Sequence, residues 1–219
     1  MPVSVIIPTL NEEAWIAGAV ESAFAAGAAE VIVADGGSGD RTARYATAAG
    51  ARVLLTEALR ARQLNRGAEA ATSDVLIFLH ADSRLPAGAA LAAEVALAKG
   101  RAFGGFRIRF LEQGAKLRVA AALINLRTAI TRAPWGDQGQ FIGRDTFLAN
   151  PYREIPIMED YEFAMRMRPA VVLPLTITSS GRRFLKKGLL RTAIVNWLTI
   201  WRYHRGADPQ KLARAYREE

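Results

Sequence analysis

The sequence predicts a single α/β domain in which helices flank a mostly parallel central sheet. Through the first hundred residues, short runs of β-branched and aliphatic side chains alternate with longer segments of helical pattern. One run, VLIFLHAD at 75–82, is apolar almost to its end, which is typical of a strand buried on both faces of a parallel sheet. Strands that alternate with helices predict right-handed crossovers within one parallel sheet.

Four strands, separated by three helices, are predicted within residues 1–100. The strands are VSVIIPTL (3–10), EVIVADGG (30–37), RVLLTEA (52–58) and VLIFLHAD (75–82). The helical patterns follow over 11–24, through Tyr45 and Ala49 toward Gly50, and over 61–71. Pro8 ends the first β-branched run. We expect this half to bind a nucleotide, because open α/β sheets bind ligands at the carboxyl ends of their strands.

Residues 101–180 are expected to complete the site. They carry a half-exposed strand (102–110), a helix (115–132) and a strand that enters and leaves a turn (136–147). Glu159 and Asp160 follow at the expected start of a helix, in IPIMEDYEFAMRM. The helix dipole favours negative charge at that position.

Residues 181–219 are predicted to form basic, amphipathic C-terminal helices. Large apolar residues recur there at helical spacing. They are Leu190, Ile194, Trp197 and Trp201. Three interpretations are open: this face contacts an anionic membrane surface, packs on the core, or packs on a second copy of the chain in a homodimer.

Composition narrows the classes of site and partner. The 219 residues suffice for one domain with a full core and are too few for two ordinary ones. There is no cysteine, and two histidines, His80 and His204, are too few for a zinc site, so any metal is expected to have oxygen ligands. The net charge of +8 suits anionic partners, but no nucleic-acid module signature occurs and no nucleic-acid partner is expected.

The sequence also predicts the location of the protein. The N-terminus MPVSVIIPTLNEE lacks the basic and apolar regions of a signal peptide, and no window reaches the roughly 18 apolar residues of a membrane span. We therefore expect a cytoplasmic protein, with peripheral contact to the inner face of the membrane as the alternative for the C-terminal helix.

Six segments, in their order and spacing, resemble an inverting glycosyltransferase of family 2. They are SVIIPTLNEE, VIVADGGSGDRT, RARQLNRGAEAA, LIFLHADSRLP, WGDQGQFIGRDTF and IMEDYEFAMRM. The resemblance covers most of the chain from Val3 to about Arg168, and it implies the GT-A fold, which is a Rossmann-like α/β domain. The ending SSGRRFLKKGLLRT…YHRGADPQKLARAYRE is similar to a small bacterial subgroup linked by name to arsenosugar biosynthesis.

The resemblance implies which residues contact a nucleotide-sugar donor, with a UDP-sugar favoured. They are Pro8, Thr9, Asn11, Glu12, Asp35, Gly36, Gly37, Arg62, His80, Ala81, Arg182 and Arg183. Glu12 would reach the ribose and Asp35 the nucleobase, although Gly36 replaces a second acid that is common at that position. Helix capping by Thr9 or Asn11 is an alternative, and Arg62 is nearly as well explained as a surface residue.

The HAD segment, 80–82, occupies the place of the Asp-x-Asp motif of this family. The resemblance implies that Asp82 holds Mg²⁺ or Mn²⁺ against the donor diphosphate, with His80 in place of the first acid. A hard cation would neutralise the charge that develops on the leaving diphosphate. The alternative is that Asp82 caps the following turn.

The resemblance places the general base at Asp160. In an inverting transfer this carboxylate takes the proton from the acceptor hydroxyl as it attacks the anomeric carbon. Glu159 would orient the base or the donor sugar, although two acids in a first helical turn also arise for dipole reasons alone. The acceptor-side loop would contain Trp135, Asp137, Gln138 and Gln140. A loop tryptophan that packs on a neighbour is the alternative.

The sequence thus predicts a glycosyltransferase that moves a sugar from a UDP-sugar to a hydroxyl acceptor with inversion and with a divalent metal. Arg182 and Arg183 would close over the diphosphate or belong to a basic patch with Lys186, Lys187 and Arg191. One alternative is a nucleotidyltransferase, which would need a basic glycine-rich loop after the first strand. The other is a non-catalytic nucleotide-binding or membrane-surface protein.

Overall fold

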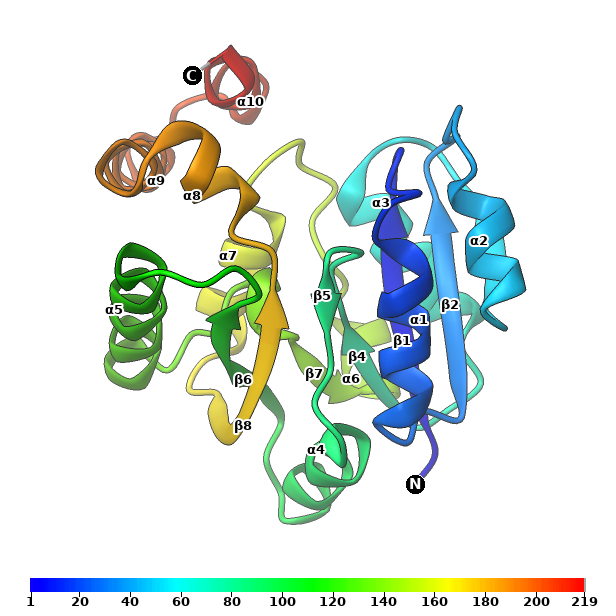
Figure 1. Cartoon of the computed structure of the whole chain (residues 1–219). Coiled ribbons are helices and arrows are strands. Elements are labelled where there is room, and N and C mark those ends of the chain that lie inside the picture. The colour runs from blue at the N-terminus through cyan, green and yellow to red at the C-terminus, as the bar shows by residue number, and fades with distance from the viewer. Residues whose placement is uncertain (219) are drawn as a thin grey trace.

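One 8-stranded sheet runs through the computed structural model, which describes residues 1–218 of the chain (Figure 1). Its strand order is β3-β2-β1-β4-β7-β6-β8-β5. The strands are β1 (Val3–Thr9), β2 (Glu30–Asp35), β3 (Arg52–Leu55), β4 (Val75–Phe78), β5 (Ser83–Arg84), β6 (Phe103–Phe110), β7 (Phe141–Gly143) and β8 (Val171–Ser179). β3, β2, β1 and β4 are parallel neighbours, as are β6 and β8, whereas β7 and β5 run antiparallel to the strands beside them. The predicted α/β domain with a mostly parallel sheet is confirmed.

Helices cover both faces of the sheet. They are α1 (Ile16–Ala25), α2 (Thr42–Ala48), α3 (Arg60–Ala70), α4 (Ala89–Ala98), α5 (Ala115–Thr131), α6 (Arg144–Ala149), α7 (Glu159–Met167), α8 (Arg182–Lys187), α9 (Leu189–His204), α10 (Pro209–Glu218) and the 3-10 helix η1 (Gly136–Gln138). Helices α1, α2 and α4 bury side chains on one face, and α3, α6 and α7 on the other. The C-terminal helices α8 to α10 lie beyond the carboxyl end of β8, at the upper left of Figure 1. Glu219, the last residue of the predicted C-terminal segment, lies outside the described residues.

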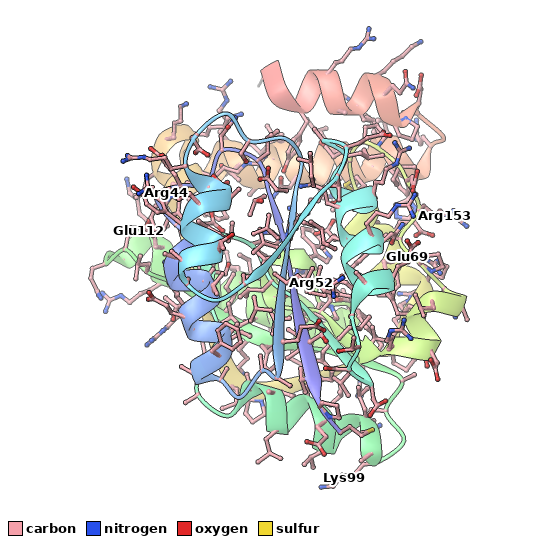
Figure 2. All side chains as sticks on the ribbon, turned by 90° about the vertical axis from the view of Figure 1, so that its right-hand side faces the viewer. Arg44, Arg52, Glu69, Lys99, Glu112 and Arg153 are labelled. Carbon is pink, nitrogen blue, oxygen red and sulfur yellow. The ribbon has the colours of Figure 1, made fainter. Side chains whose placement is uncertain are left out.

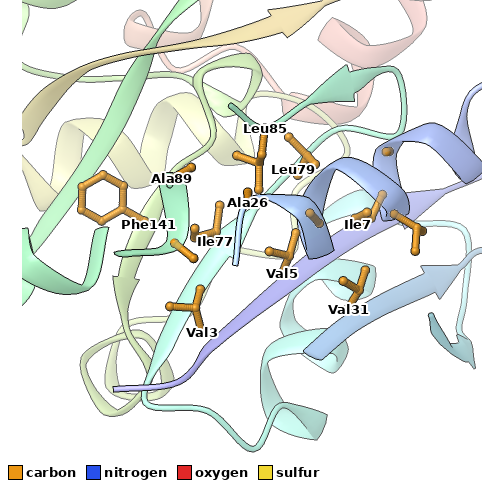
Figure 3. Close-up of a cluster of buried hydrophobic side chains, with 14 of the residues drawn as sticks. Val3, Val5, Ile7, Ala26, Val31, Ile77, Leu79, Leu85, Ala89 and Phe141 are labelled. Atoms are coloured by element: carbon orange, nitrogen blue, oxygen red, sulfur yellow. The ribbon is translucent and has the colours of Figure 1, made fainter. Parts of the chain in front are cut away.

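The apolar runs of β1 and β4 contribute side chains to two hydrophobic clusters, one on each face of the sheet. Alternate residues of a strand point to opposite faces of the sheet. Val5 and Ile77 belong to the cluster beneath α1 and α4, which is shown in Figure 3. Ile6 and Leu76 belong to the cluster on the opposite face, beneath α3. Burial on both faces explains why 75–79 is apolar without a break.

Several predicted boundaries differ from those in the structure. α1 begins at Ile16 rather than at Asn11, because the residues before it form a turn bonded to the connection between β2 and α2. The C-terminal helical pattern is divided at Gly188, which lies between α8 and α9. Its φ of 83° is a conformation that glycine adopts readily. The segment 136–147 forms η1, β7 and α6 rather than one strand that enters and leaves a turn. β3 and β4 also end before their predicted boundaries.

Three elements of the structure were not predicted: α4, β8 and the two-residue strand β5. The sequence of α4, AALAAEVALA, is apolar on all sides and shows no one-sided period. β8 contains Pro174, and a proline within an apolar run argues against a strand because it cannot donate to the ladder. The register between β6 and β8 shifts after Phe106, which is paired with Leu173, so Pro174 falls where no residue of β6 is matched to it.

Gly67 determines how closely α3 approaches β1, and its replacement tests this packing. A Cβ there would overlap the Cγ2 methyl group of Ile6, which is fully buried. We expect Gly67→Ala to lower the free energy of unfolding by about 1–3 kcal/mol through overpacking. The matched control is Gly18→Ala on α1, whose Cβ would meet only the flexible guanidinium of Arg84. Urea unfolding of both variants checks this, and equal stabilities would contradict the close approach.

Candidate active site

Two adjoining cavities open at the carboxyl ends of the parallel strands. The larger cavity has a volume of about 500 Å³ and the smaller cavity about 300 Å³. The residues that line both, and so lie at their junction, are Arg60, His80, Asp82, Pro156 and Arg182. The HAD segment and Arg182 therefore lie at the centre of the cleft, where the sequence predicts them to act together.

The smaller cavity is built from the ends of β1 and β4 and the start of α3. Pro8, Thr9 and Glu12, which are predicted to contact a nucleotide, line it, as does Ala81. The amide of Gln63 donates hydrogen bonds of 2.7 and 2.8 Å to the backbone carbonyls of Thr9 and Ala34. Because these carbonyls belong to the ends of β1 and β2, Gln63 fixes the strand ends beside the cavity.

Asp35 organises the turn after β2 rather than facing a cavity. It is 3% exposed and accepts hydrogen bonds from the hydroxyls of Thr9 and Ser38 at 2.8 and 2.5 Å. The backbone N–H groups of Ser38 and Gly37 donate to its other oxygen at 2.8 and 3.2 Å, and Gly36 N–H bonds to the Thr9 carbonyl. A carboxylate accepts about four hydrogen bonds, so a contact between Asp35 and a nucleobase would require this turn to rearrange.

Asn11 joins the turn after β1 to the turn after β2. Its φ of 56° lies in the left-handed region, which asparagine adopts more readily than most residues. Its backbone N–H donates to Ser38 Oγ at 2.9 Å, and its side-chain oxygen accepts from the Gly39 N–H at 2.9 Å. Asn11 therefore supports the smaller cavity from behind and does not cap α1.

Arg182 lies between the two carboxylates of the junction. Its guanidinium makes a bidentate pair with Glu12 at 2.7 and 3.1 Å, and its Nε lies 3.2 Å from Asp82 Oδ2. Burial raises the pKa of Asp82, although attraction to Arg182 opposes this effect. The planar fork of an arginine suits paired oxygens of a carboxylate or a phosphate.

The loops that carry Asp82 and Arg182 form one unit at the far edge of the sheet. The Asp82 carbonyl accepts a hydrogen bond from the Ser180 N–H at 3.1 Å. The hydroxyl of Ser83 donates to Ser179 Oγ at 2.9 Å, where β5 pairs with β8. The position of Asp82 therefore depends on two strands that lie far apart in the sequence, β5 and β8.

Arg60 contacts His80 and the acids at the start of α7. Its Nε lies 3.1 Å from Glu159 Oε1, without the alignment of a hydrogen bond, and its Nη2 contacts His80 Nε2. Burial, with Arg60 and Arg182 nearby, holds the pKa of His80 well below its usual range, so this imidazole is neutral. Burial raises the pKa of Glu159 to about 7; attraction to Arg60 opposes this rise and repulsion from Asp160 adds to it.

Asp160 is held beside the larger cavity by two backbone N–H groups. Its Oδ2 accepts from Gly136 and its Oδ1 from Tyr161, both at 2.8 Å. A Cβ on Gly136 would lie 2.7 Å from Asp160 Oδ2. It would also lie 2.9 Å from His80 Nε2 and 3.0 Å from Arg60 Nη2. These polar groups therefore converge on one place, and only glycine leaves room for them.

Trp135 and Asp137 line the larger cavity, where the acceptor-side loop is predicted. The guanidinium of Arg127 lies 3.5 Å from the centre of the Trp135 ring, and Tyr161 packs edge-on against that ring at 5.6 Å. Burial raises the pKa of Asp137, and within residues 1–218 its buried Oδ1 has no hydrogen-bond partner. A buried acceptor without a donor is suited to a ligand hydroxyl.

Gln138 and Gln140 position this loop and do not present free amides. Both side chains are fully buried. Gln138 accepts a hydrogen bond from the Thr128 hydroxyl at 2.7 Å and donates to a backbone carbonyl of β6 at 3.1 Å. Gln140 donates to the Asp160 carbonyl at 3.0 Å and accepts from the Tyr152 hydroxyl at 2.5 Å. Contact with an acceptor would require these bonds to break.

Arg183 and Arg62 lie away from the smaller cavity. Arg183 lines the larger cavity, where its guanidinium contacts the Tyr216 hydroxyl and lies 4.1 Å from the centre of that ring. Arg62 pairs with Glu57 and Glu154 on the outer side of α3. The structure therefore does not bring Arg62 to the cleft, and it separates Arg183 from the pair that Arg182 makes with Glu12.

The charged or hydroxyl-bearing residues not predicted include Arg60 and Tyr216, which line the cleft, and Arg127, which stacks on Trp135. Helical spacing could have identified Arg60, because the buried positions Leu64 and Gly67 of α3 follow it at four and seven residues. The same spacing places Arg62 on the opposite, exposed side. Arg127 and Tyr216 carry no comparable signal, since the packing of a whole helix brings Arg127 to Trp135 and Tyr216 to the larger cavity.

The junction suits a divalent cation that a ligand helps to bind. Within residues 1–218, no group of three or more His, Asp or Glu side chains could hold a metal ion. Asp82 offers one carboxylate, and the neutral imidazole of His80 lies at the same junction. Mg²⁺ is commonly held by one or two carboxylates together with substrate phosphates. The residues present fit that arrangement.

A mostly parallel sheet, a two-part cleft at its carboxyl ends and acids from separate elements agree with what the resemblance to a GT-A glycosyltransferase predicts. The sequence profile of "Glycosyl transferase family 2" matches residues 4–146, which is more than half of the chain. The chain therefore belongs to this family and is a glycosyltransferase. No individually curated protein matches the chain by sequence.

Solved structures share the fold at low sequence identity. The structure of glucosyl-3-phosphoglycerate synthase from Mycobacterium tuberculosis with Mn²⁺, UDP-glucose and phosphoglyceric acid has a TM-score of 0.62 at 20% identity, over 94% of this chain and 80% of that one. Mannosyl-3-phosphoglycerate synthase from Rubrobacter xylanophilus has a TM-score of 0.61 at 18% identity, over 94% and 75%. S. aureus TarS with UDP-GlcNAc has a TM-score of 0.64 at 19% identity, over 83% and 59%. The chain thus spans from about three fifths to four fifths of these proteins, and the predicted GT-A fold is confirmed.

The pKa of Glu159 predicts that stability falls as pH rises. Glutamate in an unfolded chain titrates near pH ~4.3, whereas burial raises the pKa of Glu159 to about 7 in the fold. Between these values the folded state retains a proton that the unfolded state has released, so raising the pH favours unfolding, by on the order of 1–3 kcal/mol. Urea unfolding from about pH 5 to 8 measures this, and Glu159→Gln should flatten the profile.

The matched control for this profile is Glu69→Gln, which removes an exposed carboxylate of α3. The stability of this variant should depend on pH in the same way as that of the wild type. Equal slopes in the wild type and in Glu159→Gln would show that Glu159 is already ionised at pH 5.

Proposed function

We propose that the protein transfers a sugar from a UDP-sugar to a hydroxyl acceptor with inversion, assisted by a divalent metal. The observation that carries this proposal is the arrangement of Asp82 and Asp160. Asp82 lies at the junction with the smaller cavity, and Asp160 lies beside the larger one. Membership of glycosyl transferase family 2 favours this chemistry over a nucleotidyltransferase or a non-catalytic binding protein.

The smaller cavity is the proposed donor site. Its walls include the backbone of Pro8 and Thr9, the carboxylate of Glu12 and the guanidinium of Arg182. Arg182 presents a planar fork that suits diphosphate oxygens once Glu12 turns to the ribose. UDP-glucose and UDP-GlcNAc are the nucleotide sugars bound in two of the similar structures, which supports the choice of a UDP-sugar.

Asp82 is the proposed protein ligand of Mg²⁺ or Mn²⁺, together with the donor diphosphate. When bound, the ion supplies positive charge beside the leaving diphosphate. Two similar structures contain Mn²⁺ with UDP or UDP-glucose, which supports a metal at this cleft. Neutral His80 adds no charge beside Asp82, so the carboxylate keeps its attraction for a cation.

Asp160 is the proposed general base. The N–H groups of Gly136 and Tyr161 orient its carboxylate, and it removes the proton from the acceptor hydroxyl as the anomeric carbon is attacked. The cation of Arg60 lies next to Glu159 and stabilises the negative charge of this pair. Trp135 and the unpaired Oδ1 of Asp137 offer an aromatic face and a hydrogen-bond acceptor to the acceptor molecule.

The acceptor class, the cellular location and the subgroup are further parts of the proposal. Phosphoglyceric acid is bound in two of the similar structures, so phosphorylated small hydroxy acids are suitable first trial acceptors. We propose that the enzyme acts in the cytoplasm. Among residues 1–218 no helix is long and apolar enough to cross a membrane.

The resemblance to arsenosugar-biosynthesis glycosyltransferases remains a prediction. Membrane contact and a homodimer concern the C-terminal helices and are independent of this chemistry.

A metal-dependent thermal shift tests the donor site. A ligand at about 100 times its dissociation constant stabilises by roughly 2.7 kcal/mol, or about 5–10 °C for a chain of this size. We expect UDP together with Mn²⁺ to produce such a shift. UDP alone, Mn²⁺ alone, and GDP, CDP or ADP with Mn²⁺ should each produce a smaller one. The absence of any metal-dependent shift would reject the donor site.

Asp82→Asn should remove the part of this shift that depends on metal while the variant still unfolds cooperatively. The matched control is Asp74→Asn, which makes the same change to an exposed residue at the opposite end of β4. Retained metal dependence in Asp82→Asn would place the ligand elsewhere.

Asp160→Asn should separate binding from chemistry. The amide fits the same space but cannot take a proton, so UDP and Mn²⁺ should bind as before while turnover falls about 10²–10⁴-fold. Glu159→Gln should lower turnover less. The measurement is UDP release from the donor with added acceptor, alongside UDP affinity. Unchanged turnover in Asp160→Asn would reject it as the base, and a larger loss in Glu159→Gln would assign the base to Glu159.

A further inference from the structure

Helices α5 and α9 are in contact along the left side of Figure 1. Both expose large apolar side chains. On α5 these residues are between 52% and 74% exposed, and on α9 between 42% and 74%. They are Val119, Leu123, Leu126 and Ile130 of α5, and Leu190, Ile194, Trp197 and Trp201 of α9. We call this surface the lateral face. Its spacing is helical on both elements, so each helix contributes a continuous apolar stripe.

The lateral face is not part of the core. α9 buries a different side, with Thr192, Val195 and Thr199, against the rest of the chain. α5 likewise buries Leu117 and Ala120 rather than its exposed stripe. The interpretation that the apolar residues of α9 pack on the core is therefore wrong for Trp197 and its exposed neighbours. An apolar surface of this kind usually marks an interaction site.

The charge around the lateral face has one sign. No Asp or Glu occurs between Glu112 and Asp137, which covers α5, or between Glu162 and Asp208, which covers α8 and α9. Exposed basic residues border the apolar stripes. They are Lys116, Arg118, Lys186, Arg191, Arg202 and Arg205. The partner of this surface must therefore offer apolar contact together with negative charge.

We infer that the lateral face docks on an anionic lipid bilayer. Exposed tryptophans beside aliphatic residues suit the boundary between headgroups and acyl chains, and a basic border suits anionic headgroups. A second copy of the chain would bring the same basic border against this one, with no acid to pair with it. Nucleic acid would match the charge but not the exposed leucine, isoleucine and tryptophan side chains.

Docking would place the larger cavity next to the lipid surface. Asn196, Thr199 and Ile200 of α9 line that cavity, while Trp197 and Trp201 of the same helix belong to the lateral face. The width of the single helix α9 thus separates the cavity from the proposed lipid contact. Contact is peripheral, because within residues 1–218 no helix meets the length and apolarity needed to span a bilayer.

Vesicle co-sedimentation of the full chain, without donor or metal, tests this inference independently of the proposed chemistry. We expect binding to vesicles of phosphatidylglycerol and phosphatidylcholine, weaker binding at high salt, and little binding to phosphatidylcholine alone. Tryptophan fluorescence should shift to the blue on binding, since two of the four tryptophans lie on the lateral face. Equal binding to both kinds of vesicle, or to neither, would overturn the inference.

Two pairs of matched variants locate the contact. Each basic residue near an anionic surface contributes roughly fivefold to binding, so Lys186→Glu with Arg191→Glu should weaken it at least about 25-fold. Arg44→Glu with Lys99→Glu makes the same charge change on α2 and after α4, away from the lateral face (Figure 2), and should have a much smaller effect. Trp197→Ala with Trp201→Ala should also weaken binding, whereas Leu55→Ala with Leu91→Ala, at other exposed apolar positions, should not.

Other outcomes would assign the surface to another partner. Equal losses in the two charge variants would show that net charge alone draws the protein to vesicles. A stable dimer in sedimentation without lipid, abolished by the tryptophan variant, would assign the lateral face to a second copy. Binding to duplex DNA without binding to vesicles would assign it to nucleic acid. Circular dichroism of each variant confirms that the fold is retained.

Discussion

The guanidinium of Arg60 is the interaction on which the cleft depends. Arg60 is the first residue of α3, in the part of the chain that forms the smaller cavity. Its guanidinium reaches Glu159 at the start of α7, beside the larger cavity. Two adjacent acids in a half-buried cleft repel each other, and burial favours their neutral forms. Attraction to the fixed cation opposes the rise in the pKa of Glu159, so the charge of this carboxyl depends on a contact between segments about a hundred residues apart. Neutral His80 completes the arrangement without adding to the positive charge.

Buried amides fix the loops around this charged centre. Gln63 joins the ends of β1 and β2, Gln138 joins η1 to β6, and Gln140 joins β7 to α7. Each amide satisfies backbone carbonyls that would otherwise be buried without a donor. Such bonds are directional, so they set loop positions more precisely than apolar packing does. The cleft residues that would touch ligands can then remain charged and partly exposed while their backbones are held.

The elements with a clear period or position were predictable. The two-faced burial of β4 follows from its unbroken apolar run, and the acids at the start of α7 follow from their place before a helical pattern. The functions of Asp35 and Gln138 were less accessible, because a polar residue in a loop motif looks the same whether it faces a ligand or ties the loop together. That choice is made by tertiary contacts such as the Thr9 and Ser38 hydroxyls around Asp35. Helix packing, which no local pattern encodes, brings Tyr216 to the larger cavity and Arg127 to the Trp135 ring.

The pairing of β5 with β8 has a consequence for the order in which the protein can be made. The hydrogen bond between Ser83 and Ser179 joins residues 96 positions apart, and the pair between Glu12 and Arg182 joins residues 170 positions apart. On a ribosome, the first strands and helices can pair as soon as they emerge, but Asp82 lacks its contacts with Ser180 and Arg182 until those residues have been synthesised. The smaller cavity therefore becomes complete only after Arg182 has emerged, and a chain that stopped before β8 would hold the first four strands without the partner that joins Glu12 to Asp82.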